Sequence, residues 1–144
     1  MIAKIGRSSN LYGALAYNNL KVEKEHGHII MCNKIIETVS GSFTAAQLLK
    51  SFGPYLLANR NTERHTIHIS LNPDPKDHVT DEMFCEMAQQ YMAAMGYGEQ
   101  PFVVFKHTDI DRSHIHIVSV CVDENGRKIS DKFEKRRSME ICRD

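Results

Sequence analysis

Apolar and polar positions follow two different periods along the chain, and these periods separate predicted strands from predicted helices. Strands repeat every two residues, whereas helices bring positions three and four apart onto one face. Pro54 falls inside one helical pattern and is expected to kink or split that helix. The pattern predicts strands over residues 1–5, 28–33, 64–71, 102–106 and 114–122, and helices over residues 11–20, 45–59, 81–95 and from 131 onward.

The connection between the last two strands decides the fold class. Residues 107–113 are too few for a crossover helix, so the strands on either side are expected to be antiparallel. The whole order of elements predicts an α+β domain, in which helices pack on one face of an antiparallel sheet. With 144 residues and no linker or repeat, the chain is expected to form one domain, residues 1–144. The last helix runs to the end of the sequence, which favours a fragment of a longer protein.

Composition and charge change this picture little. The chain is 42% hydrophobic and 25% charged, as in an ordinary globular domain, and its net charge of zero removes any overall basic bias toward nucleic acid. From Arg127 to Asp144, however, seven Lys or Arg stand against four Asp or Glu. The four cysteines form no CxxC pair, and no signal peptide or membrane-spanning apolar run is present. The sequence therefore favours a cytoplasmic protein with reduced thiols and no membrane association.

Three histidines near the last predicted hairpin carry the candidate chemistry. His114 and His116 are two residues apart in a strand and therefore share a face, and His107 ends the neighbouring antiparallel strand. Three convergent imidazoles would hold a divalent metal and leave positions open for a substrate. A lone strand histidine is usually structural, so the prediction depends on the three together. Asp109, two residues after His107, is the better of the loop carboxylates for fixing an imidazole tautomer.

Two other pairs of residues are ambiguous from spacing alone. His65 and His68 are three apart in a predicted strand, so only one can face the site, and Ser70 shares the face of His68. Tyr12 and Tyr17 lie on the first helix, five residues apart, and point in different directions. A tyrosine can attack phosphorus as a covalent nucleophile. Without further context, core packing is the better explanation of both tyrosines.

Taken together, the segments resemble the relaxase or mobilisation nuclease family, within the wider HUH endonuclease group. The opening MIAKIGRSSNLYGALAY resembles the family's first strand and nucleophile-bearing helix, and HTIHISLNP with the helix after it resembles the middle of the domain. FVVFKHTDIDRSHIHIVSV resembles the metal motif and is the most specific of the three. The resemblance covers nearly the whole chain. It implies an HUH/Rep-like relaxase fold and the N-terminal catalytic domain of a plasmid or transposon mobilisation protein.

The resemblance also implies the roles of individual residues. Tyr17 matches the nucleophile, the three histidines of the metal motif match the metal ligands, and Asp109 matches the acidic residue that follows the first of them. His68 is expected to be an active-site neighbour. The implied reaction is attack of Tyr17 on a phosphate of single-stranded DNA at a transfer origin, giving a 5′-phosphotyrosyl enzyme and a free 3′-hydroxyl.

The implied cofactor is a divalent metal ion, Mn²⁺ or Mg²⁺, with Zn²⁺ or Ni²⁺ as substitutes in vitro. The implied partners are the DNA strand, accessory mobilisation proteins and a coupling protein. Basic residues would follow the DNA backbone, and the run Lys135, Arg136 and Arg137 is the one cluster among them. The other candidates are single residues, namely Lys4, Arg7, Arg127 and Lys128.

Five other functions share parts of this sequence pattern. Rolling-circle replication initiators and single-tyrosine transposases share the metal motif, but their tyrosine helix typically follows it. Two-histidine phosphoesterases require a second H-x-S element, and His116-Ile-Val118 lacks the hydroxyl. Histidine-triad hydrolases would have a histidine at Val118. A metal-containing DNA-binding module without enzymatic activity would bind metal and form no covalent DNA adduct.

Overall fold

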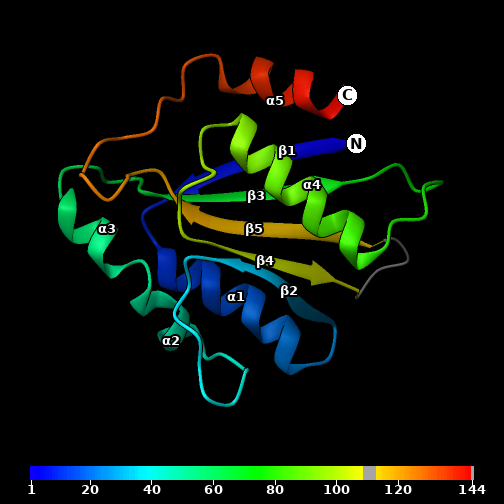
Figure 1. Cartoon of the computed structure of the whole chain (residues 1–144), viewed down its shortest axis with the longest axis horizontal. Coiled ribbons are helices and arrows are strands. Elements are labelled where there is room, and N and C mark those ends of the chain that lie inside the picture. The colour runs from blue at the N-terminus through cyan, green and yellow to red at the C-terminus, as the bar shows by residue number, and fades with distance from the viewer. Residues whose placement is uncertain (109–112, 144) are drawn as a thin grey trace.

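Strands and helices form in the order that the hydrophobic pattern predicts. The computed structural model describes residues 1–108 and 113–143. All predicted strands and helices are confirmed, with their ends moved by a few residues, and the helix predicted over residues 45–59 is split into two. The elements are β1 (Ile2–Ser8), α1 (Leu11–Glu23), β2 (Gly27–Asn33), α2 (Ala45–Lys50), α3 (Gly53–Ala58), β3 (Thr66–Asn72), α4 (Asp81–Ala94), β4 (Phe102–His107), β5 (His114–Val120) and α5 (Glu134–Arg143) (Figure 1).

The five strands form one antiparallel sheet. Their order is β1-β3-β5-β4-β2, and Figure 1 shows them in this order from top to bottom. The predicted antiparallel pairing of β4 with β5 is confirmed, with His107 directly opposite His114. β5 is the central strand, and both it and β4 are buried along nearly their whole length. The α+β fold with helices packed on an antiparallel sheet is therefore confirmed.

Helices cover both faces of this sheet, so the expectation of helices on one face is wrong. On one face α4 and α5 pack against a cluster that includes Ile69 and Ile117. On the other face α1, α2 and α3 pack against a cluster that includes Phe105 and Val118. The reason is the sequence of the central strands, which is apolar at consecutive positions. Such strands expose apolar side chains on both faces, and both faces must then be buried.

Pro54 explains why the predicted helix 45–59 is two helices. Thr44 begins α2 with a capping box, in which its hydroxyl accepts from the Gln47 backbone N–H and the Gln47 side chain accepts from the Thr44 backbone N–H. Pro54 lies in the first turn of α3, where its missing N–H leaves no helical hydrogen bond unmade. The chain therefore turns between Lys50 and Gly53 and starts a new helix.

All four cysteines are free thiols in the described residues. Burial raises the pKa of the Cys32 thiol to about 11, so little thiolate forms there at neutral pH. No helix within residues 1–108 and 113–143 is both long and apolar enough to cross a membrane.

Candidate active site

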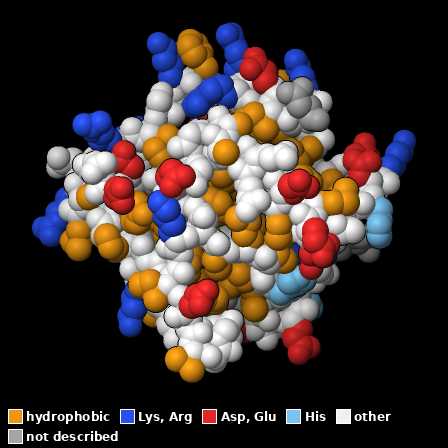
Figure 2. Space-filling view, viewed as in Figure 1, with side chains coloured by type: hydrophobic (Ala, Val, Ile, Leu, Met, Phe, Trp, Pro, Cys, Tyr) orange, Lys and Arg blue, Asp and Glu red, His pale blue; other side chains and the backbone are white. Residues whose placement is uncertain are grey.

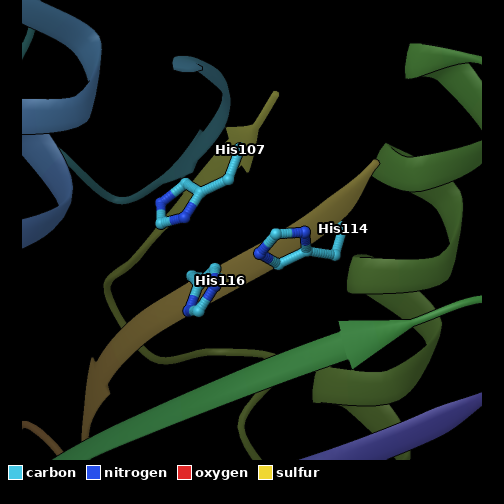
Figure 3. Close-up of side chains that lie close together, drawn as sticks. All are labelled: His107, His114 and His116. Carbon is cyan, nitrogen blue, oxygen red and sulfur yellow. The ribbon is translucent and has the colours of Figure 1, made fainter. Parts of the chain in front are cut away.

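Three imidazoles meet where β4 ends and β5 begins (Figure 3). His107 is the last residue of β4 and lies directly opposite His114, the first residue of β5. Residues directly opposite in an antiparallel pair point to the same face, and so do residues two apart. His116 therefore projects beside His114, on the sheet face that α1, α2 and α3 partly cover. We call this face the histidine face.

The distances between the three rings suit a shared metal ion. One nitrogen from each of His107, His114 and His116 can be chosen so that all three lie within 4.8 Å of one another. The rings of His107 and His116 are stacked with centroids 4.1 Å apart, and His107 itself is only 3% exposed. Imidazole nitrogens are good ligands for Mn²⁺, Co²⁺, Ni²⁺ and Zn²⁺. Three such ligands leave further coordination positions open, so these residues fit a catalytic metal ion.

A fourth histidine contacts this cluster from β3. His68 Nε2 lies 2.9 Å from His116 Nδ1, at hydrogen-bond distance. Burial lowers the pKa of His68, which favours its neutral imidazole at pH 7. Because His116 Nδ1 makes this contact, Nε2 is the nitrogen through which His116 would bind a metal. His65 lies apart from the cluster and bonds through Nδ1 to the neighbouring Thr66 hydroxyl, 2.9 Å away. Of the two histidines, His68 is the one that reaches the site.

Tyr17 lies on α1, the helix that packs over the histidine face. Asn10 caps this helix by accepting a 2.9 Å hydrogen bond from the Gly13 N–H, and Leu15 is buried beneath it. Tyr17 is 56% exposed and Tyr12 is 52% exposed. Neither tyrosine is therefore a core aromatic, which removes the simplest structural explanation for both.

The remaining predicted residues are less directly connected to the cluster. Asp109 lies outside the described residues. Lys135 and Arg136 are exposed on α5, which packs on the face opposite the histidines, and Figure 2 shows basic side chains gathered along the upper edge where α5 lies. Arg137 donates to the Ser130 carbonyl oxygen at 2.9 Å. The three-residue basic run is thus divided between two exposed cations and one guanidinium bonded within the protein.

Sequence reasoning missed one polar network, which lies on the opposite face. The Lys106 ammonium and the His28 ring both contact the Asp81 carboxylate, and these hydrogen bonds lower the pKa of Asp81. Asp81 is the first residue of α4, directly after its cap Thr80. The network ties the start of α4 to β2 and β4. In the sequence, the feature that points to this network is the position of Asp81, an acidic residue directly after the helix cap Thr80.

Comparison with known proteins agrees with this geometry. The family model described as "Relaxase: MobA/VirD2-like, nuclease domain" matches residues 17–144, a span that includes all three histidines. The chain belongs to this relaxase family. No curated protein matches it. Membership gives the relaxase a role in nicking DNA during mobilisation and implies binding of single-stranded DNA at a transfer origin. Relaxase domains are metal-dependent in general, and the buried histidine cluster is where this relaxase could hold a metal ion.

Proposed function

We propose that this relaxase nicks one strand of DNA at a transfer origin by tyrosine transesterification, with Tyr17 as the nucleophile. The observation that carries the proposal is the position of Tyr17 on α1. This helix covers the sheet face on which His107, His114 and His116 converge. The tyrosine is also exposed, as a nucleophile that must reach a large substrate has to be.

In the proposed reaction the Tyr17 oxygen attacks phosphorus in line. A P–O bond forms to tyrosine, and the bond from phosphorus to the 3′-oxygen breaks. The phenol loses its proton and the departing 3′-oxygen gains one, so the products are a 5′-phosphotyrosyl protein and a free 3′-hydroxyl. The phosphodiester is exchanged without hydrolysis, so the same step can run backwards and rejoin the strand. This reversibility favours a tyrosine over water as the nucleophile.

The three clustered histidines would hold the divalent ion, Mn²⁺ or Mg²⁺, with Zn²⁺ or Ni²⁺ as substitutes in vitro. That ion would supply Lewis-acid stabilisation of the negative charge that develops at phosphorus. We assign His68 a supporting role through its contact with His116. Asp109 is assigned a supporting role by its place in the sequence, beside His107, either as a hydrogen-bond acceptor for an imidazole or as a proton acceptor.

Two alternatives lead to different expectations. A replication initiator or transposase of the same chemistry would nick a replication origin or a transposon end instead of a transfer origin. A metal-containing DNA-binding module would bind metal and DNA without forming a covalent product. The proposed nicking at a transfer origin also includes accessory mobilisation proteins and a coupling protein as partners. Its candidate DNA contacts are Lys135, Arg136 and Arg137.

A covalent-adduct assay tests the proposal. Labelled single-stranded oligonucleotides that tile the DNA flanking the gene are incubated with the protein and Mn²⁺, then separated on a denaturing gel. We expect one oligonucleotide to give a band shifted by the mass of the protein, and EDTA to abolish that band. Tyr17→Phe should abolish it as well, because phenylalanine has no oxygen to attack phosphorus.

Tyr12→Phe is the matched control, since Tyr12 lies on the same helix and is similarly exposed. It should form the adduct as the unmodified protein does. An adduct that persists in Tyr17→Phe and disappears in Tyr12→Phe would move the nucleophile to Tyr12. Absence of any adduct with every oligonucleotide, alongside normal metal binding, would favour the non-enzymatic module.

A further inference from the structure

Half of the histidine face carries no apolar cover. The cluster beneath α1, α2 and α3 takes its described strand residues from β2, β4 and β5, and none from β1 or β3. Apart from Thr66, which is buried, the residues of β1 and β3 on this face are exposed or only partly buried. We call this region the open strip; it consists of Ile2, Lys4, Gly6, His68, Ser70 and Asn72.

The open strip is continuous with the candidate metal site. Lys4 lies opposite Ser70, and Ser70 lies opposite His116, so the three form one row across three strands. Neighbouring strands are about 4.8 Å apart, which puts the Lys4 backbone roughly 10 Å from that of His116. These residues, together with Gly6 and His68, line a hollow of about 280 Å³. His116 therefore belongs both to this hollow and to the histidine cluster.

We propose that the open strip binds the single-stranded DNA beside the scissile phosphate, and that the Lys4 ammonium contacts a neighbouring backbone phosphate. This inference rests on the proposed function, because it takes the DNA strand to be held at the histidines. Charge favours this occupant. Lys4 is the one permanently charged residue of the strip, it is exposed, and no carboxylate belongs to the strip.

Arg7 is the other basic residue of β1. Its side chain points to the opposite face of the sheet and pairs with Glu134 of α5. Lys4 itself also borders a second hollow, of about 210 Å³, which includes Asp74. A carboxylate repels phosphate, so the DNA backbone is expected on the Gly6 side of Lys4, toward His116. A polar strip with one cation at its edge is better suited to binding a nucleic-acid backbone than to binding an apolar protein surface.

Fluorescence anisotropy of a short labelled oligothymidylate tests the strip without requiring the nick sequence. Its binding to the protein is titrated with Mn²⁺ present over a range of salt concentrations. One lost phosphate contact on a single strand lowers the salt slope by about 0.7. Lys4→Gln should therefore bind roughly eightfold more weakly at about 50 mM salt and approach the unmodified protein near 1 M. Its affinity for Mn²⁺, measured by calorimetry, should be unchanged.

Gly6→Val is a second variant that blocks the hollow without changing charge. A Cβ at Gly6 would meet only the His68 carbonyl oxygen, at 3.8 Å, which is an ordinary contact. Valine also suits a strand better than glycine, so thermal stability should be equal or higher. Oligothymidylate binding should nevertheless weaken. This combination separates a blocked surface from a misfolded protein.

Lys50→Gln removes a lysine from α2, away from the strip, and is the control for net charge; it should keep the salt slope of the unmodified protein. If Lys4→Gln and Gly6→Val both bind oligothymidylate like the unmodified protein, the inference is overturned and another segment or partner covers the strip. Failure of the proposed function has a different signature. In that case no covalent adduct forms, while Lys4→Gln still weakens binding.

Discussion

At the scale of single residues, local spacing predicts the candidate metal ligands and long-range pairing decides what surrounds them. His107, His114 and His116 belong to one hairpin, so the strand period and a short connection are enough to bring them together. His68 belongs to β3, whose pairing with β5 joins residues about 50 positions apart. Spacing gives no information on that pairing. The sequence therefore predicts the cluster but leaves open which of His65 and His68 reaches it.

The contact between His68 and His116 leads to a prediction about metal affinity. An outer residue that bonds to a metal-ligating imidazole fixes its orientation, and losing such a bond typically costs 10–100-fold in affinity. His68→Leu should therefore weaken Mn²⁺ binding by about tenfold or more. His68→Gln should retain most of the affinity, because its side-chain amide offers both a donor and an acceptor that can replace His68 Nε2 in the contact with His116 Nδ1. Isothermal titration calorimetry on the folded variants measures both.

His65→Leu is the control for this comparison, since His65 lies on the same segment and bonds to Thr66 instead of the cluster. It should bind Mn²⁺ like the unmodified protein. A His68→Leu variant with unchanged affinity would show that the His68 contact does not position His116. The metal-free stability of each variant, measured by thermal unfolding, separates this effect from a general loss of structure.

At the scale of elements, the sequence predicts where helices begin and where a proline divides one. It does not predict the sheet face on which each helix packs. The helical pattern over residues 11–20 correctly predicts where α1 begins, and Pro54 correctly predicts that the helix over 45–59 divides. The face depends on where β3 is inserted, between β1 and β5, and on how the central strands are buried. These are pairings between distant segments. The expectation of helices on one face was wrong for this reason.

The cap of α1 predicts an unusual response to a common stabilising substitution. Gly13→Ala in a helix normally stabilises by about 1 kcal/mol. Here a Cβ on Gly13 would lie 2.3 Å from Asn10 Nδ2, so the capping side chain would have to move. Loss of that cap costs about 1 kcal/mol, and the net change should be close to zero. In the Asn10→Ala background there is no cap to lose, and Gly13→Ala should stabilise by about 1 kcal/mol.

Urea unfolding of the four proteins of this double-mutant cycle measures the coupling between the two positions. An Asn10→Ser and Gly13→Ala double variant is the control, because serine caps a helix with a shorter side chain and should allow the full gain. Equal stabilisation by Gly13→Ala in both backgrounds would mean that the Asn10 cap is not displaced. The cycle matters for function, because α1 carries Tyr17.

At the scale of the whole molecule, the two faces of the sheet differ in how much of each is covered by apolar packing. α4 and α5 bury one face in a large apolar cluster, whereas the other face keeps an open strip beside the histidines.

The end of α4 shows how the buried face is closed. Gly96, at a φ of +91°, ends the helix, and the Tyr97 N–H bonds to the Met92 carbonyl oxygen at 2.7 Å. This turn directs the Tyr97 side chain into the core, where it is 1% exposed.

Burial of Tyr97 predicts how the stability of the whole domain depends on alkaline pH. Burial raises the pKa of Tyr97 from 10.0 to about 12, with the nearby Arg7 guanidinium partly opposing the shift. The unfolded chain therefore loses this proton at a lower pH than the folded protein. The stabilisation is complete below pH ~10 and is lost as the pH rises toward ~12, by on the order of 2 kcal/mol.

Tyr97→Phe cannot ionise and should lose less stability than the unmodified protein over this pH interval. Urea unfolding at several pH values between ~9 and ~12 gives the change in the free energy of unfolding for each protein. The comparison uses the slope against pH, so a constant effect of removing the hydroxyl does not enter. Equal slopes for Tyr97→Phe and the unmodified protein would show that the Tyr97 phenol does not titrate differently on folding.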